Sequence, residues 1–461
     1  MSTIPRLLHQ PALSSLDAYL EIGGGQGLAG ARHIGPDDAI AEIADAGLRG
    51  RGGAGFPTGT KWRSVASGGG RHHYAVCNAA EGEPGTFKDR ALLRANPYAV
   101  LEGLLIAAES VGARGAYLAM KASFEPELAS VRRALGEIEA AGWLGEITVT
   151  IVTGPDEYLF GEEKALLEVI EGNEPLPRWL PPYLHGLFVT APQLGWQAHE
   201  PEAGHRRGHE ANPTLVNNAE TLAHTAWILA HGADAFRQAG TEQSPGTLLC
   251  TVVGDIEHPA VVEVPMGTSL RALLDLCGGT HEGRTVKAIF PGVANAVLTG
   301  ADLETPLSYE AMEAAGSGLG AGGFIIYDDS ACMVDVAATL SRFLYVESCG
   351  QCPPCKLGSA EITAALDRIR TGEGSDVDLG RIEEHLRIVA DGNRCYLPVQ
   401  ERTVVSSILR FFPEDVTAHL EGWCPSERQH IITPKVSDLV HGVVTYDPRQ
   451  EHKRPDWTYD A

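Results

Sequence analysis

Three cysteines at regular spacing, Cys349, Cys352 and Cys355, form the pattern with the most specific chemistry in the sequence. The C-x2-C-x2-C spacing allows one short loop to present three thiolates to a single inorganic cluster, and Cys395, 40 residues further on, is the natural fourth ligand. A structural zinc site is one alternative, although such sites usually show paired C-x2-C knuckles. Buried apolar cysteines are another, but Gly and Pro separate these three. The spacing therefore predicts an iron–sulfur cluster and an electron-transfer protein.

A second segment that could do chemistry is the glycine-rich stretch 47–62, in which five glycines fall within nine positions. Such a loop lets the backbone approach a flat or phosphorylated ligand closely, with its N–H groups unobstructed. The segment satisfies G-x-G-x-x-G, but residues 40–46 before it are expected to be helical, whereas the dinucleotide fingerprint requires a strand there. A mobile surface loop is the alternative. The basic side chains that suit a phosphate site are Arg49, Arg51 and Lys61.

Polar side chains also follow expected strands or begin expected helices at three further places. These are Asn78, Glu81 and Glu83 after the first strand, Gly161, Glu162 and Glu163 at one helix start, and Asn217 and Asn218 at another. Amides and carboxylates can hydrogen-bond the ring nitrogens and the ribityl and ribose hydroxyls of a flavin–nicotinamide site. Each group taken alone is equally explained by helix capping.

The elements that must position these residues fall into three kinds. Alternating expected strands and helices in the first part predict an α/β layer with a parallel sheet, in which ligands collect at the carboxyl ends of the strands. The expected strands are 72–78, 115–121 and 147–152, and the expected helices are one capped by Asn96, one at 126–141 and one at 162–171. From residue 246, short strands around a helix at 268–276 predict a small α+β module. Helical spacing then predicts a bundle with the cluster cysteines at its helix junctions, over 331–345, 358–371, 380–391 and 398–411.

Charge and composition limit the partners. The formal net charge is −24, which disfavours nucleic acid and anionic membrane surfaces as partners. No run of about 18 apolar residues is present, so direct membrane insertion is not expected, and no secretion signal is recognised at the N-terminus. Nine cysteines, four of them assigned to a cluster, favour a reducing compartment and a cytoplasmic location. The other five are expected to be structural: Cys77, Cys250, Cys277, Cys332 and Cys424.

The four motifs and the cysteine motif, taken in order, resemble the NADH-binding flavoprotein subunit of respiratory complex I over about residues 34–412. This subunit has soluble relatives, the diaphorase subunit of NAD-linked hydrogenases and the beta subunit of NAD-linked formate dehydrogenases. The resemblance implies a Rossmann-like domain for FMN and NADH, a ubiquitin-like module and a helical bundle with one [4Fe–4S] cluster. The corresponding ranges are 1–240 (with an insertion at about 193–211), 246–328 and 330–420, followed by an extended tail at 421–461.

The resemblance also implies roles for individual residues. The FMN contacts implied are Gly50, Gly52, Lys61, Asn78, Glu81, Gly161, Glu162, Asn217, Asn218 and Thr221. The NAD(H) contacts implied are Phe56, Glu83, Glu163 and Tyr183, and the cluster ligands are Cys349, Cys352, Cys355 and Cys395. The implied reaction is hydride transfer between NADH and FMN and single-electron transfer to the cluster, with no side chain acting as acid or base. The implied partners are a thioredoxin-like [2Fe–2S] subunit and a larger iron–sulfur, molybdopterin or hydrogenase subunit.

The sequence departs from this family pattern at several positions. Ala80 replaces an acid that contacts the flavin, Lys164 replaces a threonine, and Ser64 stands where an aromatic residue near NADH is often found. The insertion contains His199, His205 and His209, for which a solvated loop is favoured over a metal site. The predicted function is an NAD(H)–FMN module of a soluble multi-subunit oxidoreductase, such as an NAD-linked formate dehydrogenase or hydrogenase, which Ala80 and the insertion mildly favour. The alternatives are the NADH-input subunit of membrane-bound complex I and a non-catalytic scaffold that keeps the cluster but has lost flavin.

Overall fold

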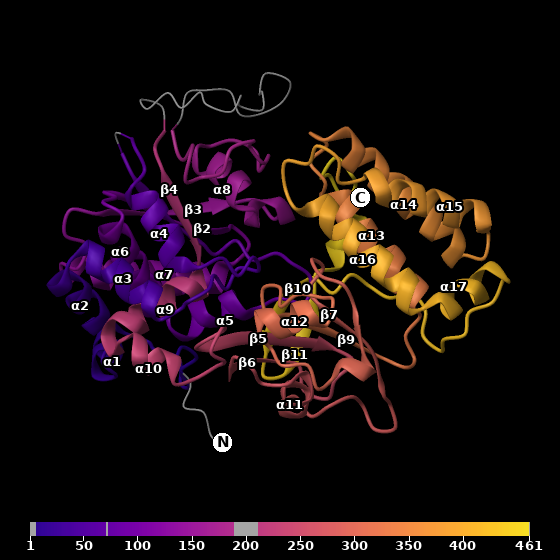
Figure 1. Ribbon diagram of the computed structural model, residues 1–461, viewed down its shortest axis with the longest axis horizontal. Coiled ribbons are helices and arrows are strands. Elements are labelled where there is room, and N and C mark those ends of the chain that lie inside the picture. Colours follow the sequence, from indigo (N-terminus) through magenta and orange to yellow (C-terminus); the bar gives the residue numbers. More distant parts are fainter. Residues whose placement is uncertain (1–5, 71, 189–210, 461) are drawn as a thin grey trace. The chain divides into compact units, whose positions relative to one another are not determined.

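The computed structural model describes residues 6–70, 72–188 and 211–460, which form two compact units (Figure 1). The first unit comprises Met1–Gly82, Lys88–Leu249 and Val262–Gly267. The second comprises Glu83–Phe87, Cys250–Val261 and Thr268–Ala461. The histidines expected in the insertion, His199, His205 and His209, lie outside the described residues.

The first unit is built on a four-stranded sheet in the order β3-β2-β1-β4, in which every neighbouring pair is parallel. The strands are β1 (Tyr74–Asn78), β2 (Gly115–Lys121), β3 (Thr148–Gly154) and β4 (Thr214–Asn218). The register pairs Asn78 with Ala119 on one side and with Asn218 on the other. The carboxyl ends of β1 and β4 therefore lie side by side, and the parallel sheet predicted from the sequence is confirmed.

The two faces of this sheet carry separate apolar cores because side chains alternate along a strand. Ala75 and Cys77 of β1 pack on the larger core, whereas Val76 packs on the smaller one. The smaller core is covered by η1 (Tyr158–Gly161) and α8 (Glu163–Ile170). The larger core is covered by α1 (Leu16–Glu21), α2 (Gln26–Ile34), α3 (Pro36–Asp45), α4 (Thr58–Ala66), α5 (Lys88–Ala95), α6 (Pro97–Ser110), α7 (Glu125–Ala140), α9 (Ala219–His231) and α10 (Ala233–Arg237).

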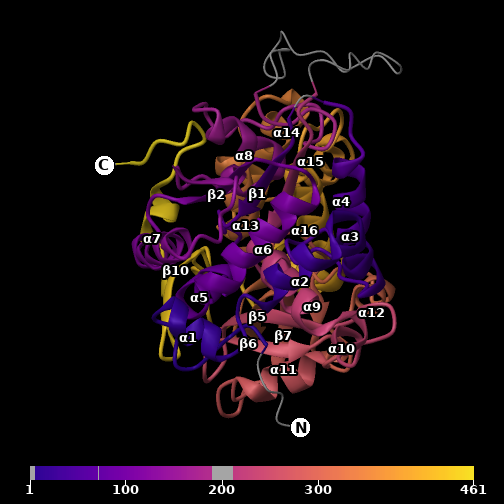
Figure 2. The same cartoon turned by 90° about the vertical axis from the view of Figure 1, so that its left-hand side faces the viewer.

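Helix α6 shows how local sequence signals determine where a helix of the first unit begins. Asn96 is its N-cap and accepts a hydrogen bond from Ala99 N, and Pro97 occupies the first turn, as the sequence predicted. Its residues are almost all buried, in keeping with an apolar stretch packed on both sides. Figure 2 shows α3 and α4 side by side in the same unit, with the glycine-rich loop between them in the chain.

In the part of the chain that the structure describes, no single helix has the length and apolar character of a membrane span. Helices α5 and α6 reach that length and apolar character only when taken together, and the pair is bent by 100°.

The chain also forms a five-stranded mixed sheet in the order β6-β5-β9-β7-β8. Its strands are β5 (Thr247–Gly254), β6 (Ala260–Pro265), β7 (Val286–Pro291), β8 (Leu298–Thr299) and β9 (Gly323–Asp328). Strand β9 runs parallel to β5 and antiparallel to β7. The short helices of this part are α11 (Leu270–Leu276), η3 (Gly300–Asp302) and α12 (Tyr309–Ala314). The predicted small α+β module is confirmed.

The helical bundle of the second unit follows this sheet in the chain. Its helices are α13 (Met333–Glu347), α14 (Pro353–Arg370), α15 (Asp376–Ile388), α16 (Leu397–Phe411) and α17 (Pro413–Leu420). Helix α14 begins at Pro353 rather than at residue 358 as predicted, because prolines are well suited to the first turn, where their missing N–H has no helical partner. Cys355 therefore lies in the first turn of a helix.

The tail differs from the extended segment that the sequence predicted. It contains an antiparallel hairpin of β10 (Val436–Val440) and β11 (Val443–Tyr446), followed by η4 (Pro448–His452). Lys453 is fully buried and its Nζ lies 2.9 Å from both carboxylate oxygens of Glu347, at the end of α13. Arg342 of the same helix donates to the carbonyl oxygens of Gln450, Glu451 and Lys453. Long-range polar contacts of this kind leave no local signal in the sequence.

Candidate functional site

The carboxyl edge of the parallel sheet gathers polar side chains from several chain segments. Asn78, the last residue of β1, donates from Nδ2 to Gly161 O at 2.7 Å, which links β1 to the start of α8. Asn218, the last residue of β4, N-caps α9 and accepts from Glu220 N at 3.0 Å. Asn217 beside it accepts from the indole Nε1 of the buried Trp62 at 2.8 Å. Three amide side chains are thereby fixed at one edge of the sheet.

The glycine-rich loop lies against this edge. Arg51 N donates to Thr221 Oγ1 at 2.9 Å, which ties the loop to the first turn of α9. A Cβ on Gly52 would lie 3.1 Å from Asn218 Cβ, so a side chain there would crowd the edge of the sheet. Gly53 has φ of 116°, a conformation that L-residues rarely adopt. The loop therefore keeps its backbone bare next to the asparagines, and it presents the kind of cradle that a flat or phosphorylated ligand requires.

Not all basic side chains of the loop are available to bind a ligand next to the glycine backbone. The guanidinium of Arg51 is buried and donates to Thr247 O at 3.2 Å and to Pro245 O at 3.0 Å, and Arg49 Nε donates to Gly55 O at 2.7 Å. The expectation that Arg51 supplies charge to a phosphate site is therefore wrong, because its side chain holds backbone together. Lys61 Nζ instead forms an ion pair with Glu163 Oε2 at 2.8 Å, and both side chains are partly exposed.

A buried network of charges lies behind the edge. Lys88 Nζ is fully buried and lies 2.7 Å from Asp89 Oδ1, 2.8 Å from Glu220 Oε2 and 3.3 Å from Asn218 Oδ1. Burial by itself would raise the pKa of the Glu220 carboxyl, but the Lys88 ammonium and the His224 imidazole, whose Nε2 lies 3.6 Å from Glu220 Oε1, outweigh it and lower the pKa to about 2. Asp89 Oδ2 in turn accepts from Asn218 Nδ2 at 2.6 Å. The network fixes the orientation of the Asn218 amide.

Two further candidate carboxylates are occupied by helix capping. Glu81 accepts from the backbone N–H groups of Asp89 and Arg90 at 3.3 Å each, in the first turn of α5. Burial, together with the neighbouring Asp89 carboxylate, raises its pKa. Glu162 is the N-cap of α8 and accepts from Lys164 N and Ala165 N at 2.9 Å. Burial raises the pKa of Glu162 to about 7.

The residues expected to contact a nucleotide are less enclosed. Phe56 is 53% exposed and Tyr183 is 41% exposed, so both aromatic rings present surface for stacking. Glu83 belongs to the second unit, where its Oε1 accepts from Val293 N at 2.9 Å. Ser64 is exposed, and Ala80 packs in the smaller apolar core with Val76 and Phe160.

The cysteine motif occupies the junction between α13 and α14. Cys349 follows α13, Cys352 is the N-cap of α14 and Cys355 lies in its first turn, so the three thiols share the positive end of the α14 dipole. They are close enough to influence one another electrostatically. Arg394, the residue before Cys395, interacts electrostatically with Cys352 and Cys349. The structure thus brings the segment that carries the fourth cysteine to the loop that carries the other three.

The surroundings of these cysteines suit bound thiolates. Burial raises the pKa of the Cys355 thiol to about 12, so a deprotonated sulfur there requires a cation. Lys356 lies next to it in the chain and holds the loop, since its Nζ donates to Ser348 O at 2.7 Å and to Pro455 O at 2.6 Å. Four cysteines on two chain segments are the donor set of a [4Fe–4S] cluster.

Sequence reasoning missed the residues that orient the candidate contacts. Trp62 directly follows Lys61, and this position could have indicated its role in holding Asn217. Lys88, Asp89 and Glu220 gave no such signal, because charged residues at helix starts are ordinarily solvated. Only their burial identifies them as a network.

Comparison with known proteins adds three family matches. Residues 43–227 match the Nuo51 FMN-binding domain, residues 249–292 the SLBB domain, and residues 335–419 the NADH-ubiquinone oxidoreductase-F iron–sulfur binding region. The last match contains all four cysteines of the candidate cluster site.

Similar full-length proteins come from two kinds of enzyme. The F subunit of the NADH-quinone oxidoreductase of Streptomyces coelicolor is 36% identical over 442 residues, which cover 91% of this chain and 94% of that protein. The HndC subunit of the NADP-reducing hydrogenase of Solidesulfovibrio fructosivorans is 33% identical over 430 residues, which cover 91% and 83%. Among solved structures, a chain of the NAD+-reducing [NiFe]-hydrogenase in the H2-reduced state aligns with a TM-score of 0.77 and 31% identity, over 89% of this chain and 68% of that one.

Proposed function

This chain belongs to the family of NADH-quinone oxidoreductase F subunits, which are NADH-binding flavoproteins with FMN and a [4Fe–4S] cluster, and we propose which of its residues hold each group. FMN would be held at the carboxyl edge of the parallel sheet. The residues assigned to it are Gly50, Gly52, Lys61, Asn78, Glu81, Gly161, Glu162, Asn217, Asn218 and Thr221. The observation that carries this assignment is the bare glycine backbone next to amides oriented by Trp62 and Asp89.

The chemistry of the proposed site needs no side-chain acid or base. When bound, FMN exchanges hydride with NADH and exchanges single electrons with the cluster. The protein contributes orientation and electrostatics. Asn78 and Asn218 offer amide groups to the flavin ring or its ribityl chain. Lys61 offers its charge to a phosphate, which would compete with the Glu163 carboxylate that Lys61 now pairs with at 2.8 Å.

NADH would contact Phe56, Glu83, Glu163 and Tyr183. The exposed rings of Phe56 and Tyr183 support stacking with the bases of the dinucleotide. The carboxylates of Glu83 and Glu163 would accept hydrogen bonds from ribose hydroxyls, and their negative charge would disfavour a 2′-phosphate. The cluster ligands would be Cys349, Cys352, Cys355 and Cys395, with Lys356 and Arg394 supplying positive charge close to the thiolates.

Anaerobic addition of NADH to the chain purified with its native partners tests this function. Flavin and iron are quantified first, and absorbance and electron paramagnetic resonance are then followed after mixing. We expect rapid bleaching of the flavin band and the appearance of the signal of a reduced [4Fe–4S] cluster. Iron without flavin, and no response to NADH, would instead favour the scaffold that has lost flavin.

The parent assembly is proposed to be a soluble multi-subunit oxidoreductase with a separate thioredoxin-like [2Fe–2S] subunit and a larger iron–sulfur, molybdopterin or hydrogenase subunit. The similarity to an NAD+-reducing [NiFe]-hydrogenase over 89% of this chain supports it. Membrane-bound complex I is the second candidate, which the 36% identity to a protein of an NADH-quinone oxidoreductase favours. Purification of the tagged chain from membrane-free extract and from membranes, with mass spectrometry of the proteins that accompany it, separates the two.

A further inference from the structure

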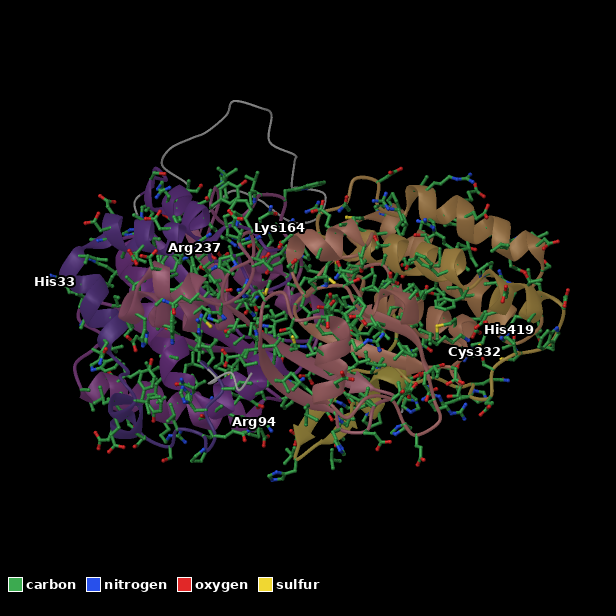
Figure 3. All side chains as sticks on the ribbon, turned by 60° about the horizontal axis from the view of Figure 1, so that its bottom comes forward. His33, Arg94, Lys164, Arg237, Cys332 and His419 are labelled. Atoms are coloured by element: carbon green, nitrogen blue, oxygen red, sulfur yellow. The ribbon has the colours of Figure 1, made fainter. Side chains whose placement is uncertain are left out.

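A second group of metal-type ligands lies in the second unit, outside the four cysteines of the candidate cluster site. Cys332 Sγ is 3.2 Å from His419 Nε2, and the ligand atoms of Cys332, His419 and Cys424 all lie within 4.8 Å of one another. Figure 3 shows Cys332 and His419 next to each other in the second unit. Cys332 and His419 are buried, and Cys424 is partly exposed. Cys332 and Cys424 were expected to be structural cysteines.

Two chain segments converge to form this group. Cys332 is the N-cap of α13, and its Sγ accepts from Asp335 N at 3.4 Å. His419 lies in the last turn of α17 and Cys424 follows after four intervening residues, so one short loop presents both side chains. That loop is tied back to Cys332, whose N–H donates to Arg428 O at 3.1 Å. A backbone hydrogen bond therefore joins the two segments independently of the three ligand side chains.

We propose that Cys332, His419 and Cys424 form a second metal site, which binds a borderline-soft divalent cation such as Zn²⁺. Two thiolates and one imidazole are a donor set that zinc prefers, and a pair of ligands from one short loop with a third from a distance matches the architecture of zinc sites. Each thiol releases its proton to solvent as the cation binds, and no electron is transferred. The two thiolates neutralise the charge of the ion.

The fourth coordination position is left to water. Asp415 lies near the group, but its Oδ2 already accepts from Lys287 Nζ at 2.8 Å and from Met333 N at 3.2 Å. The partial exposure of Cys424 gives solvent access to that side of the site. Three protein ligands and one water are a coordination that Cys2His zinc sites adopt.

Such an ion would add a coordination link between α13 and α17, two helices that already pack against each other. It would join the C-terminal end of α17 and the loop after it to Cys332, the N-cap residue of α13. Helix α13 spans Met333–Glu347, and Cys349 follows its other end. The ion would therefore anchor the helix whose far end leads into the cluster cysteines. We expect it to stabilise the bundle rather than to take part in electron transfer.

Metal analysis of the full chain, purified with its partners and without chelators, tests the proposal. We expect about one zinc ion per chain in addition to the iron of the cluster. Cys332→Ser and His419→Gln are each expected to lose most of the zinc while keeping the iron. Cys277→Ser is the matched control, because Cys277 is a fully buried cysteine of the same unit at the end of α11. It is expected to keep both metals.

A measurement on the unaltered protein covers the case in which the variants misfold. Iodoacetamide labelling of Cys424, followed by peptide mass spectrometry, is compared before and after treatment with a zinc chelator at constant iron content. We expect labelling to rise at least about tenfold once zinc is removed, because a coordinated thiolate is a poor nucleophile. Three results would each overturn the proposal. The first is a zinc content below about a tenth of an ion per chain that does not rise on dialysis against Zn²⁺. The others are equal labelling of Cys424 with and without the chelator, and a disulfide between Cys332 and Cys424.

Discussion

At the scale of single residues, the side chains with the largest energetic effect near the candidate flavin site are those buried behind it. Lys88 is the clearest case, because its ammonium has no solvent exposure and compensates the carboxylates of Asp89 and Glu220. A buried charge left without its partner is strongly destabilising, whereas an exposed ion pair contributes little. The position of Asn218, a candidate flavin contact, depends on this same group of charges.

Lys88→Met is therefore expected to destabilise the first unit by about 3–5 kcal/mol. The substitution keeps the length of the side chain but leaves two carboxylates facing each other in a buried site. Thermal unfolding followed by flavin release measures the effect. Arg114→Ala is the control, since Arg114 forms an ion pair with Glu146 in which both side chains are more than 80% exposed. An equal fall in the unfolding temperature for both variants would contradict the prediction.

Glu401 allows a prediction about pH. It is fully buried on α16, where Ser341 Oγ donates to its Oε1 at 2.6 Å, and burial raises its pKa to about 8. Because the folded pKa lies above the unfolded value of about 4.3, the stability that Glu401 contributes is fully present below the unfolded pKa. It is lost as pH rises toward 8.

Glu401→Gln should consequently stabilise the protein relative to the unaltered chain at pH 9 more than at pH 6. The glutamine cannot ionise, so its stability does not follow this titration. The difference between the thermal midpoints of the two proteins, recorded at both pH values, gives the result. Glu361→Gln serves as the control because Glu361 is an exposed residue of α14. A difference that stays constant between the two pH values would show that Glu401 does not titrate in this range.

At the scale of elements, local sequence signals predicted the helices and strands well. The expected strand at 115–121 coincides with β2, and Asn96 with Pro97 marks the start of α6. Both signals act within a few residues: an apolar run bounded by turns, and a cap followed by proline. The glycine-rich loop and the polar residues at strand ends could also be found from local patterns. Their proximity could then be predicted because the carboxyl ends of neighbouring parallel strands lie at the same edge of a sheet.

Contacts between distant segments could not be predicted in this way. The Arg51 guanidinium points inward because it donates to the carbonyl oxygens of Thr247 and Pro245, which lie 196 and 194 residues after it in the sequence. Cys332 and His419 are 87 residues apart, and nothing near either one indicates the other. The buried pair of Glu347 and Lys453 is separated by 106 residues. In each case tertiary packing determines which residue is the partner. The sequence around a single residue therefore does not predict that partner.

The tail hairpin is the element whose attachment is most easily tested. Lys453→Met leaves the Glu347 carboxylate buried without its cation, which is expected to cost about 3–5 kcal/mol. We expect the tail to detach locally, with faster amide hydrogen exchange over residues 443–453 and little change in the parallel sheet of the first unit. The double variant Glu347→Gln with Lys453→Met removes both charges and should restore most of the protection. Equal exchange in the single and double variants would refute a role for the ion pair.

At the scale of the whole molecule, the two halves of the proposed reaction draw on different units. Every residue assigned to FMN belongs to the first unit, and all four assigned cluster cysteines belong to the second. The apolar cores that hold the parallel sheet are composed of first-unit residues. Glu83 is the one assigned NADH contact in the second unit, and the hydrogen bond that it accepts from Val293 N does not involve the cluster segment. A defect at the cluster should therefore leave flavin binding and its reduction by NADH intact.

Cys395→Ala tests this separation. Removal of one assigned ligand is expected to abolish the paramagnetic signal of the reduced cluster, because no second thiol in the 394–397 segment can replace it. FMN content and the rate of anaerobic flavin bleaching by NADH should stay within about twofold of the unaltered protein, since the first unit keeps its own core. Cys277→Ala, which removes a buried thiol of the second unit outside the cluster motif, should leave both the flavin and the signal unchanged. If Cys395→Ala lost its flavin while Cys277→Ala kept it, the cluster would be required for the first unit to fold around FMN, and the two halves would have to be treated as one cooperative structure.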